Sequence, residues 1–159
     1  MIFTDLDFIR ESNRIEGIHR EPTAEEVAEF ERFMALEAIA IADLVQFVAV
    51  YQPSALLRTD AKTHGVRVGE HTAPPSGPAI GHALNKLLSR ANDVSVWRRV
   101  RDGEAYAVHV AYETLHPFTD GNGRSGRMLW RWMVDPAPLG FLHHFYYQTL
   151  AASQARGAS

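Results

Sequence analysis

Residues 116–127 read His116-Pro117-Phe118-Thr119-Asp120-Gly121-Asn122-Gly123-Arg124-Ser125-Gly126-Arg127. Proline in second position disfavours helical geometry in the residue before it, so we expect a helix to end at His116. A turn rich in glycine follows, and apolar residues recur at helical spacing from Met128 to Met133. The pattern therefore predicts two helices joined by a short turn, with the second helix beginning near Gly123 or Arg124.

The turn has the features of a binding site for an anion. Its glycines allow the backbone to approach a ligand closely. Backbone amides at the start of the second helix attract negative charge, and the helix dipole adds to this attraction. Arg124 and Arg127 are three residues apart, so both can reach the same anion from one face of the helix.

Two further side chains in the run suit phosphate chemistry. Asp120 is a hard oxygen ligand, which fits Mg²⁺ when phosphates supply more ligands. A histidine side chain with an unperturbed pKa of ~6.5 accepts a proton near neutral pH, so His116 is suited to the role of a base. Together with the anion site, these groups predict a cradle for a polyphosphate with its own metal ligand and general base.

Three better-known motifs do not fit the same run. A Walker A loop needs Lys and Ser/Thr where Arg127 and Met128 stand, and it follows a strand. A calcium-binding loop needs a glutamate where Arg131 stands. A dinucleotide fingerprint requires a βαβ unit, which the surrounding pattern does not predict.

The rest of the chain predicts helices and one hairpin. Valines at 66 and 68 alternate with polar residues and indicate a short exposed hairpin, and the proline-rich run 74–78 that follows it excludes a helix. We expect the fold to be all-α with this one hairpin. The expected helices cover residues 5–17, 23–51 as one long helix capped by Thr23 and Glu26, 80–93, 102–116 and 124–133, with a last one over 141–150.

Composition narrows the class of protein. The 159 residues fit a single domain, and 46% hydrophobic with 22% charged residues is typical of a globular one. The net charge of −3 lacks the basic field of a general nucleic-acid-binding protein. Without cysteine, the chain has no disulfides, zinc–thiolate sites or cysteine nucleophiles. The start of the chain does not resemble a signal peptide, and its apolar stretches are short of a membrane span, so we expect a cytoplasmic protein without a membrane partner.

The run at 116–127 resembles the signature of the Fic family, His-Pro-Phe-x-Asp/Glu-Gly-Asn-Gly-Arg-x-x-Arg, at every specified position. The similarity extends over most of the chain. It implies packed helices with a β-hairpin flap beside the active site. It also implies AMP transfer from ATP to a Tyr, Thr or Ser hydroxyl of a target protein, which could be the chain itself, with release of pyrophosphate.

The resemblance also implies roles for individual residues. His116 resembles the general base, Asp120 the Mg²⁺ ligand and Phe118 an inward-pointing anchor. The family's anion hole corresponds to Gly121, Asn122 and Gly123. Arg124 would hold the β-phosphate region of ATP and Arg127 its γ-phosphate. The flap that holds the target by strand addition corresponds to Val66, Arg67, Val68 and Gly69.

A second resemblance lies near the N-terminus. Residues 12–17 read Ser12-Asn13-Arg14-Ile15-Glu16-Gly17 and resemble the family's inhibitory-helix pattern, Ser/Thr-x-x-x-Glu-Gly/Asn. By this similarity, Glu16 would pair with Arg127 and obstruct the γ-phosphate, with Ser12 and Gly17 as the other specified positions. We therefore expect an inhibitory segment over 1–20, a Fic domain over 21–152 and a flexible tail over 153–159.

Other interpretations of the same residues remain open. The fold could remove AMP by activating water, with Glu16 taking part, or transfer another nucleotide or a phosphate. A non-catalytic nucleotide-binding module is a third alternative. We interpret Arg131 as part of a solvated helix face, and we do not expect His109 and Glu113, one helical turn apart, to form a site.

Overall fold

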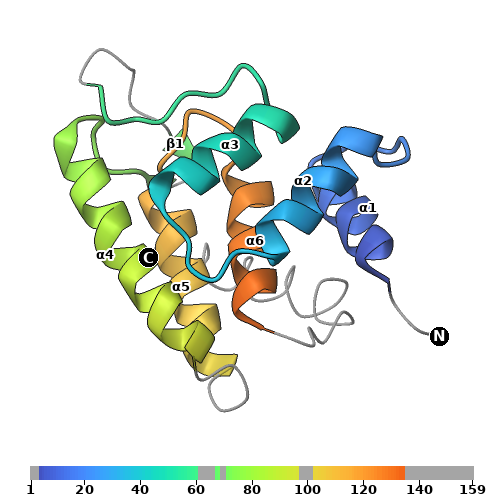
Figure 1. Cartoon of the computed structure of the whole chain (residues 1–159). Helices are drawn as coiled ribbons and strands as arrows, with labels where there is room; N and C mark the ends of the chain where they lie inside the picture. Colours follow the sequence, from blue (N-terminus) through green and yellow to red (C-terminus); the bar gives the residue numbers. More distant parts are fainter. Residues whose placement is uncertain (1–3, 61–66, 69–70, 97–101, 135–159) are drawn as a thin grey trace.

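The computed structural model describes residues 4–60, 67–68, 71–96 and 102–134. Over these residues it contains six helices and one two-stranded hairpin, which confirms the all-α fold (Figure 1). Val66 and Gly69 of the expected flap, the expected helix over 141–150 and the tail lie outside the described residues. The elements are α1 (Asp5–Ile15), α2 (Ala24–Met34), α3 (Ile41–Tyr51), β1 (Arg67–Val68), β2 (His71–Thr72), α4 (Pro78–Val96), α5 (Asp102–Leu115) and α6 (Asn122–Met133).

Helix α6 lies in the middle of the bundle and contacts each of the other five helices of the described chain. In Figure 1, α4 and α5 flank it on one side, and α1 and α2 lie on the other. All of its residues except Gly123 are buried. The first two turns of α6 carry the signature arginines, so the central place of this helix puts these charges inside the protein.

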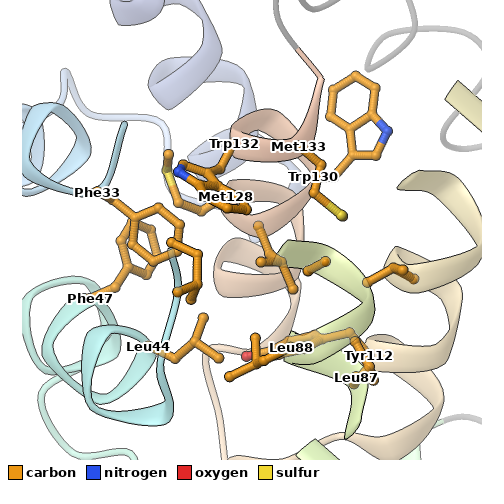
Figure 2. Packing of buried hydrophobic residues seen from close by; sticks show 14 of the residues in the cluster. Phe33, Leu44, Phe47, Leu87, Leu88, Tyr112, Met128, Trp130, Trp132 and Met133 are labelled. Carbon is orange, nitrogen blue, oxygen red and sulfur yellow. The ribbon is translucent and has the colours of Figure 1, made fainter. Parts of the chain in front are cut away.

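Aromatic side chains of α2, α3 and α6 pack together in the core (Figure 2). The rings of Phe33 and Phe47 meet edge to face with their centroids 5.6 Å apart, and Phe47 stacks on Tyr51 at 4.2 Å. Trp132 is fully buried, and its indole nitrogen donates a hydrogen bond of 2.9 Å to the carbonyl of Leu36. These contacts join α2 to α3 and, through Trp132, join the segment after α2 to α6.

The long helix expected over 23–51 is wrong, because the structure breaks it into α2 and α3. Its start is as predicted, with reciprocal bonds between Thr23 and Glu26. Between the helices, the Asn92 side chain bonds to both the amide and the carbonyl of Ile39, at 2.8 and 3.1 Å. Together with the Trp132 bond to Leu36, these contacts satisfy backbone groups that a continuous helix would pair internally. Tertiary partners therefore override a helical pattern that has no glycine or proline to interrupt it.

Asn92→Ala is expected to lower the free energy of unfolding by about 1–3 kcal/mol, because it leaves two backbone groups of Ile39 without their side-chain partner. Urea denaturation monitored by circular dichroism measures this change. Asp93→Ala is the matched control on the same turn of α4, and its exposed side chain should change stability by less than about 0.5 kcal/mol. Equal stability of the two variants would show that Asn92 does not hold the break.

Helix α4 also differs from expectation at both ends. It begins at Pro78, inside the run that was expected to exclude a helix, because proline is tolerated at a position whose amide has no helical partner. It continues past Asn92 and Asp93 to Val96. The hairpin that precedes it is as predicted, with Arg67 paired to Thr72 in antiparallel register. Among the described helices, none has the length and apolar character to cross a bilayer.

Candidate active site

His116 lies where α5 ends, as predicted. Its amide donates the last helical hydrogen bond, 2.9 Å to the carbonyl of Tyr112. Its φ angle is +53°, and in the described chain it is the one non-glycine residue with positive φ. Histidine adopts this left-handed geometry more often than most residues do. The imidazole is partly exposed, so the end of α5 presents it at the surface of the bundle.

The turn after His116 is held by the side chain of Asn122. The amide of Phe118 donates to Asn122 Oδ1 at 2.9 Å, and Asn122 Nδ2 donates to the carbonyl of Phe118 at 2.8 Å. Phe118 is buried, as expected of an anchor. Gly121 has a φ of +77°, and a Cβ there would lie 3.2 Å from that of Gln52, so the turn requires glycine. The Asn122 side chain thus shapes the turn, which leaves its backbone amide for an anion.

The first turn of α6 begins with backbone amides that have no carbonyl partner earlier in the helix. The first amide to bond back within the helix is that of Ser125, 3.1 Å from the carbonyl of Gly121. The amides of residues 122–124 therefore lie at the positive end of the helix dipole. Asp120 is exposed beside them, and its Oδ1 accepts a 2.7 Å hydrogen bond from the amide of Gly121.

Asp120 is the carboxylate of the turn that could serve as a Mg²⁺ ligand. In the described part of the chain, no group of three or more metal-ligating side chains comes together. Mg²⁺ commonly binds proteins through one or two carboxylates together with substrate phosphates. The exposed carboxylate of Asp120, next to the amides of α6, matches that donor set.

Arg127 is buried and is bound by helix α1. Its Nε donates to Ser12 Oγ at 2.8 Å, and its Nη2 donates to the carbonyl of Ser12 at 3.0 Å. The same Nη2 lies 2.7 Å from Glu16 Oε1. The Arg127 side chain is 2% exposed and that of Glu16 is 39% exposed, so the carboxylate meets the arginine at the edge of the interior. The expected pairing of Glu16 with Arg127 is present in the structure.

The Glu16 carboxylate also lies over the first turn of α6. A Cβ added to Gly123 would overlap Glu16 Oε1, so only a glycine leaves room for it. Gly17 lets the chain turn away directly afterwards, with a φ of +76° and a Schellman pair of bonds from Gly17 to Arg14 and from Ile18 to Asn13. An anionic side chain therefore lies beside the first turn of α6, against Gly123 and Arg127.

Arg124 is held by two residues that the sequence did not single out. Its Nη2 donates to Gln52 Oε1 at 2.7 Å, and its Nη1 lies 3.4 Å from Asn13 Oδ1. Its guanidinium lies 5.7 Å from the ring centroid of Tyr51, and burial lowers its pKa. Asn13 occupies an unspecified position of the inhibitory pattern, and nothing in the sequence marks Gln52. Helix α1 thus contacts both signature arginines.

Sequence comparison agrees with this arrangement. The sequence profile of the Fic/DOC family matches residues 29–134, from within α2 to the end of α6. The chain belongs to the Fic/DOC family. Fic domains generally transfer nucleotide or phosphate groups. The matched region contains His116 and the whole turn, and α1 lies outside it. A comparison with individual curated proteins found no match for the chain.

Two titratable residues of the Fic domain lie beneath the signature, although the sequence did not predict a site for them. His109 Nδ1 is 2.9 Å from the carbonyl of Gly126, and a Cβ on Gly126 would come within 2.5 Å of Glu113 Oε1. Burial raises the pKa of Glu113 to about 8 and lowers that of His109 to about 4. Both side chains are therefore neutral at pH 7. Among the described residues, Glu113 Oε1 is buried without a hydrogen-bond partner.

Glu113→Gln is expected to make stability less dependent on pH. The folded protein keeps the Glu113 proton up to about pH 8, whereas the unfolded chain releases it near pH 4.5. The contribution of this group to the free energy of unfolding is therefore present below pH 4.5 and is lost as the pH rises to 8. Melting temperatures measured from pH 5 to 8 should fall less steeply for the variant. Glu104→Gln, at an exposed position of α5, should keep the slope of the parent protein, and a parallel slope for Glu113→Gln would contradict this assignment.

The expectation for Arg131 of the Fic domain is wrong, because this arginine is buried. Its Nη2 donates to Asp5 Oδ1 at 3.1 Å, and its Nη1 donates to the carbonyl of Val134 at 3.3 Å. The spacing of Arg131 from Arg127 suggested a solvated face, but α1 covers that face. Arg131 therefore joins the start of α1 to α6.

Proposed function

We propose that this Fic protein is a Mg²⁺-dependent protein adenylyltransferase whose helix α1 keeps it inactive. The observation that carries the proposal is the arrangement at the start of α6. A complete signature surrounds the helix end, two buried arginines lie on the first two turns of the helix, and the carboxylate of Glu16 lies against Gly123 and Arg127. Such an end binds anions, and a carboxylate of the chain itself lies beside it on Arg127.

In the proposed reaction, the amides of residues 122–124 and the two arginines bind the phosphates of ATP. His116 accepts the proton of a Tyr, Thr or Ser hydroxyl, and that oxygen forms a bond to the α-phosphorus. The bond from the α-phosphorus to the bridging oxygen breaks, and pyrophosphate leaves. Asp120 would hold Mg²⁺, which neutralises phosphate charge when bound. Positioning and charge stabilisation supply most of the rate in such transfers.

The proposed inhibition is a competition between two anions for one arginine. Arg127 already bonds to Ser12 and Glu16, so the γ-phosphate of ATP would have to displace a carboxylate. Because Glu16 is partly exposed, water and salt weaken its attraction to Arg127. A modest change in conditions or a partner could therefore displace the Glu16 carboxylate from Arg127 while the buried Phe8 and Ile9 keep α1 packed on the bundle. The hairpin β1–β2 would receive an extended segment of the target by strand addition.

The product of the reaction tests this function. The Glu16→Gly variant is incubated with ATP, Mg²⁺ and a cell extract, and modified proteins, the variant included, are identified by mass spectrometry. Addition of an adenylyl group to a hydroxyl side chain is the expected result. Addition of phosphate or of another nucleotide would show that the protein transfers that group and not AMP. ATP binding without any modification would favour the non-catalytic nucleotide-binding module.

A further inference from the structure

We propose that Arg58, on the segment between α3 and the hairpin, is a positioning residue that fixes the backbone of His116 and connects it to the hairpin. The inference rests on the proposed role of His116 as the base. Nothing in the sequence pattern marks Arg58, which precedes the hairpin by several residues. Its contacts, its charge and the backbone geometry of His116 support the proposal independently.

All of the hydrogen bonds of Arg58 join segments around the active site. Its side chain is completely buried. Nε donates to the carbonyl of His116 at 2.6 Å, and Nη2 donates to that of Leu115 at 2.9 Å. Nη1 donates to the carbonyl of Pro74 at 2.8 Å and to Ser76 Oγ at 3.2 Å. One guanidinium therefore binds the end of α5 and the return of the hairpin together.

Among the residues that the structure describes, no ion pair accounts for the charge of Arg58. Burial lowers its pKa, and in the described chain no acidic side chain contributes to that pKa. Two of its partners, the carbonyls of Leu115 and His116, lie at the C-terminal end of α5, where the helix dipole favours a cation. Burying a charge is costly, and apolar replacements of buried charges are often neutral or stabilising. A contribution to stability therefore does not explain an arginine at this position. Its forked guanidinium, which can bind two consecutive carbonyls in a fixed geometry, does.

His116 is the residue that needs such support. Left-handed backbone geometry is strained for a residue with a side chain, and His116 has a φ of +53°. Arg58 holds the carbonyls of Leu115 and His116, one on each side of the strained φ and ψ angles. Its own amide donates to the carbonyl of Pro117 at 2.8 Å. These bonds fix the direction in which the backbone presents the imidazole.

The other half of the guanidinium reaches the segment that follows the hairpin. Pro74 and Ser76 come directly after β2 (His71–Thr72), and the amide of Gly77 donates to the carbonyl of Arg58 at 2.9 Å. Displacement of the hairpin would therefore act on His116 through one side chain. A target segment seated on the hairpin would be linked to the base by the same route.

Kinetics of Arg58 variants in the Glu16→Gly background test the proposal. Arg58→Met should lower kcat by about 10- to 100-fold, because small errors in placing a reacting group have effects of this size. KM for ATP should change by less than about threefold, since other residues bind the phosphates. Arg58→Lys keeps the charge but loses the forked donor, so its kcat should lie between that of the Glu16→Gly parent and that of Arg58→Met. It replaces the methionine variant in the test if that variant does not fold.

Arg32→Met is the matched control. Arg32 also uses its guanidinium to join segments, through Glu29 and Asp43 at the start of α3, and it lies outside the proposed site. It should lose stability and keep kcat. Equal loss of kcat in the Arg58 and Arg32 variants, or a loss confined to KM for ATP, would overturn the inference.

A spectroscopic measurement separates this inference from the proposed function. In ¹⁵N-labelled protein, Arg58→Met should shift the amide and ring signals of His116, and Arg32→Met should leave them in place. If the Glu16→Gly parent transfers no AMP, the proposed function fails, and these spectra still decide whether Arg58 positions His116. Unchanged His116 signals in folded Arg58→Met would overturn the inference even if the parent is active.

Discussion

His116→Asn is expected to lower kcat for AMP transfer by about 100- to 10,000-fold in the Glu16→Gly background, the usual range for loss of a general base. ATP affinity should remain within about twofold, because the amides of α6 and the two arginines, not the imidazole, would bind the phosphates. Initial rates with labelled ATP and calorimetric titration of ATP measure the two quantities.

The choice of asparagine removes the base and keeps the backbone. His116 has a φ of +53°, and asparagine is among the residues that tolerate this region. Alanine lacks that tolerance, so His116→Ala should be equally inactive and also less stable, by about 1 kcal/mol. A His116→Asn protein that is folded, binds ATP and retains a tenth or more of the activity would show that another group accepts the proton.

Glu16→Gly is expected to raise the rate of AMP transfer by about 10- to 100-fold, which corresponds to the usual coupling energies between two sites. The variant removes the carboxylate that lies on Arg127 and over Gly123, so both become available to the γ-phosphate. Its ATP affinity should rise in the same direction. Ser12→Ala removes one of the bonds to Arg127 and should activate by a smaller factor.

A control separates loss of this carboxylate from loosening of α1 in general. Glu21 pairs with Arg10 of α1 at 2.7 Å and has no part in the site. Glu21→Gln should therefore leave the rate close to that of the parent protein. If it activates as strongly as Glu16→Gly, the docking of α1 matters and the anion on Arg127 does not.

The sequence was most informative where chemistry and local geometry depend on neighbouring residues. The end of α5 follows from Pro117, and the start of α2 follows from the Thr23 and Glu26 capping pair. The run 116–127 contains a base, a carboxylate, glycines and two arginines within twelve consecutive residues. Their proximity can therefore be predicted without knowledge of the fold. The pairing of Glu16 with Arg127 could be predicted because the signature at 116–127 had already identified Arg127 as a phosphate-binding residue.

Distant contacts determine the features that the sequence did not predict. The break between α2 and α3 depends on Asn92 and Trp132, and Arg131 is buried because α1 lies over it. Arg58 and Gln52 carry no pattern of their own and matter because the fold brings them to His116 and Arg124. Helix propensity and spacing act over a few residues. The burial, the pKa and the hydrogen-bond partners of a charged side chain depend on which segments of the chain pack against it. The spacing of apolar residues within one helix does not determine which segments those are.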